Sequence, residues 1–194
     1  KVLRDWGYLD GDEPFTRLLT QGMVIKDVAK MSKSKGNVVT PLSIAGKYGA
    51  DTARLFSLFA APPEKDLDWN EKGVEGCLRF LQRIWRLCHR FQVALGQRAG
   101  DEKTLSFNDR EQAIRRKTHW MIRKMTDDIE NCKFNTAISA LMELVNELYG
   151  LLTENANAYE KDSGRFVLLE AVENLVLCLS PYAPHFGEEL WQAM

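Results

Sequence analysis

Apolar side chains recur at intervals of three or four residues from residue 71 onward, and this spacing restricts the possible folds more than any other feature. A 3.6-residue period places such side chains on one face of a helix, and that face must be buried against other elements. The sequence therefore predicts a long amphipathic helix over residues 71–97. Its apolar stripe consists of Val74, Cys77, Leu78, Leu81, Ile84, Trp85, Cys88 and Phe91.

The same periodicity continues through three further segments. A second helix is expected after Asn108, which forms a capping box with Glu111, and a third begins near Phe134. A fourth is expected over 165–179, and a fifth begins at His185 after the proline-containing break at 180–184. Connecting segments at 96–107 and 155–164 predict that the four long helices pack as an antiparallel bundle, crossing at about 20°.

The first 70 residues have a different, mixed pattern. Residues 1–6 are expected to end a helix at Gly7, 15–19 to form a short helix, and 23–25 to form a buried strand. Thr40 and Pro41 predict a helix start, with a hydroxyl cap and proline at the first helical position. Another helix is expected over 52–60, with Asp51 as its cap. The chain is thus predicted to be mainly α-helical, with a small α/β segment before the bundle and a boundary at residue 70.

Residues 30–37 (KMSKSKGN) concentrate three lysines, two serines and a glycine within eight positions. Lysine ammonium groups bind phosphate as point charges, and serine hydroxyls together with backbone N–H groups freed by glycine add donors. The spacing differs from the P-loop signature. These residue types predict an anion-binding loop after the strand. A solvated surface turn is the alternative on composition alone.

Four arginines of the first long helix, spaced four, three and four residues apart, share one face of that helix: Arg79, Arg83, Arg86 and Arg90. Guanidinium groups in such a row suit phosphate contacts in a structured RNA. The second helix adds Arg116 and Arg123 to the candidate RNA-contacting residues. The alternative is a solvated face that keeps the bundle soluble. Trp85 is expected in the core, while the pattern leaves Trp120 undecided.

Composition limits the functional classes to which the chain can belong. The net charge of −1 gives no overall basic signal, and no apolar run is long enough to span a bilayer. The four cysteines are widely spaced, which predicts reduced, buried thiols in a cytoplasmic protein and neither disulfides nor a zinc site. The histidines lack metal-ligand partners at helical spacing, so we expect no metal site.

Several segments resemble the class I aminoacyl-tRNA synthetases, and the loop at 30–34 (KMSKS) is similar to their signature loop. The flanks resemble the leucyl enzymes of the bacterial and organellar type, at 13–15 (EPF), 21–24 (QGMV), 48–56 (YGADTARLF) and 68–76 (DWNEKGVEG). The segment 184–191 is similar to one shared by the leucyl, isoleucyl and valyl enzymes. Segments 21–24 and 68–76 favour the leucyl family.

The resemblance implies roles for the loop residues. In that family the loop closes over ATP, so Lys33 is implied to stabilise the triphosphate as pyrophosphate leaves, with Lys30 assisting as a second catalytic lysine. Ser32 and Ser34 would donate to phosphates or to the loop backbone, and Met31 would pack the loop down. ATP with Mg is the implied substrate, without a metal site in this segment.

The resemblance also implies a domain plan and partners. Residues 1–36 would end the catalytic nucleotide-binding domain, 37–70 would form the stem-contact connector, and 71–194 would form a tRNA(Leu)-contacting bundle of the anticodon-binding type. Leucine would bind mostly outside this segment. Because the His-Ile-Gly-His motif and the editing domain are absent, we expect a fragment of a monomeric leucine–tRNA ligase that is inactive alone. An isoleucyl or valyl enzyme, or a non-catalytic helical RNA-binding module, is the alternative.

Overall fold

The apolar stripe after residue 71 forms helix α4 (Glu71–Leu95), and its apolar side faces the protein core. The computed structural model describes residues 2–11, 15, 17–95, 102–154 and 160–194, except for the side chains of 91–95 and 154. Val74 and Ile84 are fully buried, and Trp85 is half-buried. The predicted stripe is therefore confirmed as far as Cys88. The side chain of Phe91 and the expected helix end at residue 97 lie outside the described part.

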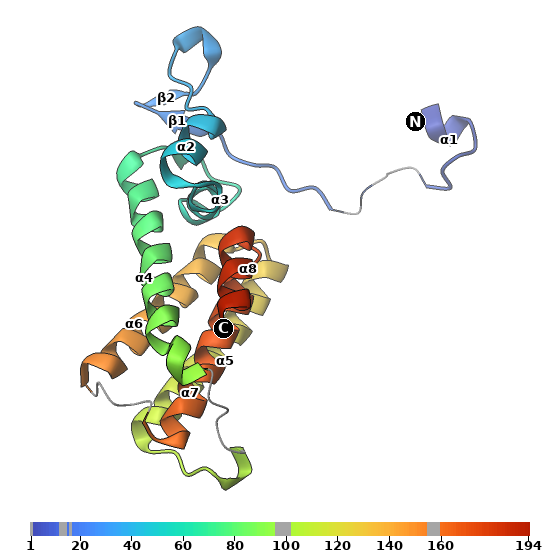
Figure 1. Ribbon diagram of the computed structural model, residues 1–194. Coiled ribbons are helices and arrows are strands. Elements are labelled where there is room, and N and C mark those ends of the chain that lie inside the picture. Colours follow the sequence, from blue (N-terminus) through green and yellow to red (C-terminus); the bar gives the residue numbers. More distant parts are fainter. Residues whose placement is uncertain (1, 12–14, 16, 96–101, 155–159) are drawn as a thin grey trace.

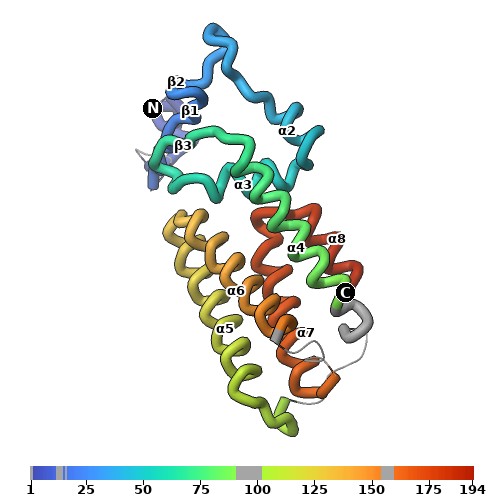
Figure 2. The backbone as a smooth tube through the Cα atoms, turned by 90° about the vertical axis from the view of Figure 1, so that its left-hand side faces the viewer, coloured from blue at the N-terminus to red at the C-terminus, as the bar shows by residue number. Residues whose placement is uncertain are grey.

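The other helices of the bundle pack around α4 and around one another (Figures 1 and 2). Helix α6 contacts both α4 and α5, and α7 contacts α4, α5, α6 and α8. The mainly helical fold with a small α/β part is confirmed. The bounds of these helices are α5 Asp109–Glu130, α6 Phe134–Glu154, α7 Asp162–Leu179 and α8 Pro184–Ala193.

Local capping fixes where several of these helices begin. The Asn108 side chain accepts a hydrogen bond from the Glu111 N–H at 2.9 Å, and the Glu111 carboxylate accepts one from the Asn108 N–H at 2.8 Å. The predicted capping box is thus confirmed. Helix α7 begins three residues before the predicted start at Arg165, and α8 includes Pro184 as its first residue, where a missing N–H costs nothing.

A three-stranded sheet lies outside the bundle, at the end of the molecule where α4 begins (Figure 1). Its strand order is β2-β1-β3, with β1 at Val24–Lys26, β2 at Ala29–Lys30 and β3 at Leu67–Asp68. β1 pairs with β2 antiparallel and with β3 parallel. The predicted strand is confirmed, but its expected burial is wrong, because Met23 and Val24 are exposed and Ile25 is only half-buried. The sheet has three short strands and, within the described residues, offers no covered interior at this point. Lys30 lies on the edge strand β2.

Helices α2 (Pro41–Tyr48) and α3 (Ala50–Phe59) lie in the chain between β2 and β3 and join the sheet to the bundle. Thr40 caps α2 as predicted, accepting from the Ser43 N–H at 3.2 Å. One residue, Gly49, separates the two helices with φ +90°, a backbone conformation that favours glycine. Residues of both helices share the hydrophobic core with α4–α8, because Leu55 is fully buried and packs within the same cluster.

Two further sequence predictions for the first 60 residues are wrong. The α3 cap is Gly49 rather than Asp51, whose carboxylate is turned toward α8. The expected helix at 15–19 is absent from its described residues, which are exposed. A segment of that length does not hold a helix without a surface to pack against. Helix α1 (Val2–Asp5) forms a single short turn that Gly7 ends at φ +77°, as predicted.

Candidate functional site

The lysine-rich loop lies directly after a tight hairpin. β1 turns into β2 through Asp27 and Val28, which have φ values of +53° and +62°. Two positive φ values in a two-residue loop give the twist that matches antiparallel strands. The Met31 N–H then donates to the Val24 carbonyl at 3.0 Å, and Lys33–Lys35 form a 3₁₀ turn that ends at Gly36, φ +68°. The loop is therefore a defined turn that projects from a sheet edge.

The Asn37 side chain holds the base of this loop together. Its Oδ1 accepts from the Ser32 N–H at 2.9 Å, while its Nδ2 donates to the carbonyls of Lys30, at 3.3 Å, and Lys26, at 3.4 Å. One amide at the end of the loop thus bonds three backbone groups on its N-terminal side, in β1, in β2 and at Ser32. Sequence reasoning missed this role, since an asparagine beside glycine is typical of any turn.

The charged groups of the loop point to solvent. Lys30, Lys33 and Lys35 are exposed, and none forms an ion pair with a carboxylate in the part of the chain that the structure describes. The hydroxyls of Ser32 and Ser34 lie 3.1 Å apart, and Met31 is half-buried. The structure thus brings the five predicted loop residues together around uncompensated positive charge, an arrangement that can receive a phosphate group.

The arginine row of α4 is divided by its surroundings. Arg83 is half-buried, donates from Nη2 to Asn146 Oδ1 at 2.9 Å, and lies over the Tyr149 ring at 4.9 Å. The Tyr149 hydroxyl donates to the Arg83 carbonyl at 2.9 Å. Arg83 therefore joins α4 to α6, a structural role that helical spacing alone does not reveal.

The other members of the row remain open to solvent. Arg79, Arg86 and Arg90 are exposed, and within the described residues Arg86 makes one hydrogen bond, from Nε to the Gln82 carbonyl at 3.2 Å. Arg86 and Arg90 border a cavity of about 390 Å³ between α4 and α6, whose lining contains no acidic residue. This groove can accept an anion.

Most basic side chains of α5 are already paired. Arg115 bonds Glu170 at 2.8 Å and Glu102 at 2.6 Å, and Lys117 pairs with Glu143. Lys124 pairs with Asp128 at 2.5 Å. The two α5 candidates from the sequence differ from these: Arg116 is exposed without an ion pair among the described residues, and Arg123 approaches Asp127 only at 3.9 Å. Both lie on α5, so the six arginines do not form one row.

Trp120 and the four cysteines differ in how far they are exposed to solvent. Trp120 is 42% exposed, with Lys117 Nζ 3.8 Å from its ring centre, so it is not a core residue. Cys77 and Cys88 are buried, and burial raises the pKa of the first thiol to about 11 and that of the second to about 12. Both are therefore unreactive thiols. The prediction of full burial is wrong for Cys132 and Cys178, which are partly exposed.

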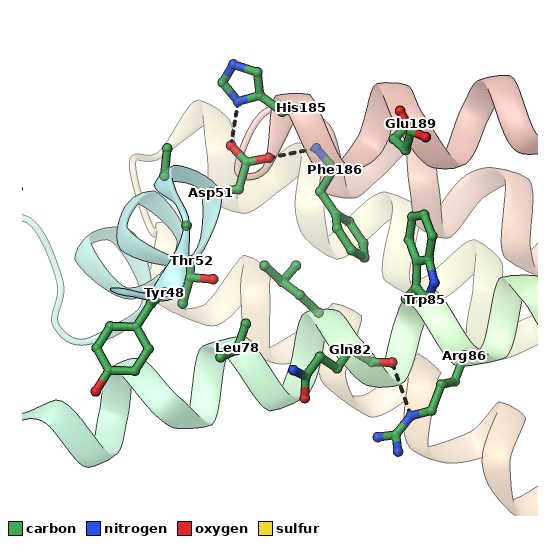
Figure 3. Close-up of a pocket in the computed structure, with 13 residues that line it drawn as sticks. Tyr48, Asp51, Thr52, Leu78, Gln82, Trp85, Arg86, His185, Phe186 and Glu189 are labelled. Atoms are coloured by element: carbon green, nitrogen blue, oxygen red, sulfur yellow. Dashed lines mark hydrogen bonds and ion pairs between the residues drawn. The ribbon is translucent and has the colours of Figure 1, made fainter. Parts of the chain in front are cut away.

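A larger cavity, unforeseen from the sequence, lies where α3, α4 and α8 meet (Figure 3). Its volume is about 810 Å³, within the range of small-molecule sites. Leu78, Leu81, Trp85 and Phe186 form its apolar walls. The lining comes from three segments far apart in sequence, so no local pattern announces it.

Asp51 closes one side of this cavity and fastens α3 to α8. Its Oδ2 accepts from the Phe186 N–H at 2.7 Å, and its Oδ1 lies 3.0 Å from both His185 Nδ1 and Arg54 Nη1. Burial disfavours the charged carboxylate, but the hydrogen bonds from His185, the Phe186 N–H and Arg54 outweigh it and lower the pKa of Asp51. Asp51 thus caps the first turn of α8 from another helix.

Comparison with known proteins shows which family this chain is similar to. Residues 7–70 match a family model described as "tRNA synthetases class I (I, L, M and V)", and residues 111–194 match one described as "Anticodon-binding domain of tRNA ligase". A leucine–tRNA ligase of Geotalea uraniireducens (strain Rf4) is 56% identical over 98% of the chain. The chain belongs to the leucine–tRNA ligase family. It spans 23% of that relative's length, and equally 23% of a Syntrophobacter fumaroxidans leucine–tRNA ligase that is 53% identical over the whole chain.

Solved structures agree with this placement. A leucyl-tRNA synthetase of Agrobacterium radiobacter K84 (agnB2 LeuRS), crystallised as a ternary complex with tRNA and LeuAMS, has a TM-score of 0.86 at 34% identity. The match covers 100% of this chain and 24% of that one. A Mycobacterium tuberculosis methionyl-tRNA synthetase shares the fold, with a TM-score of 0.71 at 18% identity over 88% of this chain and 36% of its own. The isoleucyl, valyl and non-catalytic alternatives are not favoured.

Two further properties concern membranes and metals. No helix in the described part of the chain has the length and apolar composition that crossing a bilayer requires. Within the same residues, His, Cys, Asp and Glu side chains form no group of three or more suited to a metal ion. Membership of this synthetase family implies ATP and Mg for the full enzyme. The exposed lysines of the loop, with Ser34 exposed and Ser32 half-buried, fit a triphosphate by their chemistry.

Proposed function

We propose that this chain supplies the ATP-phosphate loop and the tRNA-contacting helices of a leucine–tRNA ligase. That enzyme activates leucine with ATP and transfers it to tRNA(Leu). The observation that carries the proposal is the loop at 30–34. Its exposed lysines have no ion-pair partner among the described residues, and it occurs in a chain more than half identical to leucine–tRNA ligases.

Within the loop, Lys33 and Lys30 are the proposed catalytic lysines. When leucine attacks the α-phosphate, negative charge grows on the departing pyrophosphate, and an ammonium group held there stabilises it most where water is excluded. Ser32, Ser34 and the backbone beside Met31 would complete the phosphate contacts. Mg would be held through the triphosphate oxygens, where it neutralises charge, since the loop offers no carboxylate. Asn37 keeps the loop in shape for this contact.

For tRNA we propose contacts through the exposed arginines. Arg79, Arg86 and Arg90 on α4, with Arg116 and Arg123 on α5, are available for phosphate oxygens, while Arg83 supports the row by fixing α4 to α6. The corresponding domain plan is 1–36 for the catalytic end, 37–70 for the stem-contact connector and 71–194 for the bundle. We further propose a monomer working in the cytoplasm, where translation takes place, with leucine bound mainly by other parts of the enzyme.

Replacing Lys33 in the intact ligase tests the catalytic proposal. Lys33→Ala should lower leucine-dependent ATP–pyrophosphate exchange by about 100-fold or more, because a charge-stabilising contact in the transition state is lost. Leucine binding, measured separately, should change little. Lys35→Ala is the matched control, since it removes an exposed lysine from the same loop. Equal exchange rates for the Lys33→Ala variant and the parent enzyme would contradict the role assigned to Lys33.

A further inference from the structure

The cavity between α3, α4 and α8 is lined by polar side chains to which the proposed function assigns no role. Thr52 is only 2% exposed and lines the cavity, and its hydroxyl makes no hydrogen bond to any residue that the structure describes. Figure 3 shows this side chain turned toward the cavity. The hydroxyl has no protein partner among these residues, so a ligand that reaches it in the cavity would gain a hydrogen bond.

Other polar groups at the rim are also free. The Gln82 amide and the Glu189 carboxylate line the cavity, and neither side chain has a partner among the described residues. Asp51, by contrast, is already saturated by His185, the Phe186 N–H and Arg54, so it builds the wall rather than binding a ligand. Three separate donor or acceptor groups that lack protein partners among the described residues therefore line a cavity whose walls are largely apolar.

The apolar surface of the cavity is partly aromatic. The ring centres of Trp85 and Phe186 are 5.8 Å apart with an interplanar angle of 53°, and both rings border the cavity, with Leu78 beside them. Aromatic and branched aliphatic walls accommodate a flat ring, and aromatic side chains stack on nucleobases regardless of the base. A flat ring with hydrogen-bonding edges matches both the walls and the free polar groups.

The guanidinium group of Arg86 adds a positive charge at the edge of the cavity, where it can bind a phosphate. Arg86 lines this cavity and also borders the arginine-lined groove on the α6 side of α4. Its Nε is bonded to the Gln82 carbonyl, which leaves the terminal nitrogens of the guanidinium group for a phosphate. A group whose ring enters the cavity would thus carry its phosphate toward Arg86.

We propose that the cavity between α3, α4 and α8 is a nucleotide-binding pocket, with the base against Trp85 and Phe186 and the phosphate at Arg86. In it, Thr52, Gln82 and Glu189 contact the edge of the base. The occupant is either a free mononucleotide or a base unstacked from tRNA bound along the arginine row. The second source rests on the proposed tRNA contact, whereas the first does not.

Two measurements on the intact ligase distinguish these sources, with its synthetic site filled by a leucyl-adenylate analogue. In the first, AMP, GMP, CMP and UMP are titrated by calorimetry. In the second, tRNA(Leu) carrying thiolated bases is photo-crosslinked, and the attached peptides are identified by mass spectrometry. Saturable mononucleotide binding supports a free ligand. A crosslink to the peptide that contains Trp85 or Phe186, without mononucleotide binding, supports an RNA base.

Pocket variants decide whether either signal belongs to this cavity. Thr52→Val keeps the shape and removes the hydroxyl, so it should weaken binding or crosslinking about fivefold to tenfold. Gln82→Ala, at an exposed position, should act in the same direction without disturbing the core. Thr126→Val is the matched control, since that hydroxyl lies on α5 away from the cavity and donates to the Ile122 carbonyl.

Two results would overturn the proposal. One is the absence of both mononucleotide binding and a pocket crosslink. The other is a signal that Thr52→Val and Gln82→Ala leave unchanged. In either case tRNA affinity and aminoacylation could remain intact, so the failure would concern this pocket and leave the proposed ligase function standing.

Discussion

The Asp51 carboxylate on α3 accepts a 2.7 Å hydrogen bond from the backbone N–H of Phe186, which lies 135 residues later at the start of α8. The same carboxylate meets His185 and Arg54, and its side chain is only 10% exposed. One aspartate thus links the segment that follows the lysine-rich loop to the last helix of the bundle, across the cavity wall.

Asp51→Ala should lower the free energy of unfolding by about 1–3 kcal/mol, because the Phe186 N–H is left without its partner in a partly buried place. Urea denaturation of the chain at neutral pH measures this. Asp10→Asn is a suitable control, since Asp10 is exposed and unpaired among the described residues.

The direction in which this stabilisation changes with pH follows from the lowered pKa of Asp51. Its stabilisation is complete above the unfolded value of about 3.9 and is lost as the pH falls through the folded value. A difference between the parent and Asp51→Asn that stayed constant at acidic pH would count against this.

Val28→Gly should stabilise the β1–β2 hairpin. A β-branched residue at φ +62° costs about 1–2 kcal/mol, and glycine removes that cost while adding about 0.4–1 kcal/mol of chain entropy in the unfolded state. The Val28 side chain is fully exposed, so no packing is lost. Hydrogen exchange at the Met31 amide, which bonds Val24, should therefore slow down. Val38→Gly, at an exposed valine outside the hairpin turn, should give no such protection.

Asn37→Ala should loosen the lysine-rich loop without removing any of its charge. Three backbone groups lose their shared amide, so the loop should adopt its ATP-binding form less often. In the intact ligase we expect the KM for ATP to rise several-fold and the exchange rate to fall, with the KM for leucine unchanged. Asn37→Asp keeps the acceptor for the Ser32 N–H but loses both donor bonds. Its KM for ATP should therefore lie between those of the parent enzyme and Asn37→Ala. Parallel changes in the KM values for ATP and leucine would indicate general unfolding instead.

The arginine row of α4 should separate into structural and RNA-contacting members. Arg83→Ala should destabilise the chain by about 1–2 kcal/mol, because Asn146 and Tyr149 lose their partner. Arg86→Ala and Arg90→Ala should leave stability nearly unchanged. They should instead reduce the slope of log affinity for tRNA against log salt by about one each. If all three variants shifted stability alike and none changed the salt slope, the proposed RNA contact would be wrong.

The helices could be predicted from the sequence because their signals are local. Apolar residues at helical spacing, the capping box at Asn108 and the proline at the start of α2 each act within a few residues. The lysines and serines of the loop were also identifiable as anion-binding types. The short segment 15–19 failed because five residues carry too little pattern to establish a helix without tertiary contacts.

The sequence by itself determined the helical bundle, the strand before the loop and the chemistry of residues 30–34. Only the tertiary structure decided that Asp51 caps α8 rather than its own helix, that Arg83 is a structural residue, and that Thr52 faces a cavity. These assignments depend on which residues meet across more than 60 positions of sequence. Local periodicity fixes the face of a helix on which a side chain lies, and packing alone fixes what that face meets.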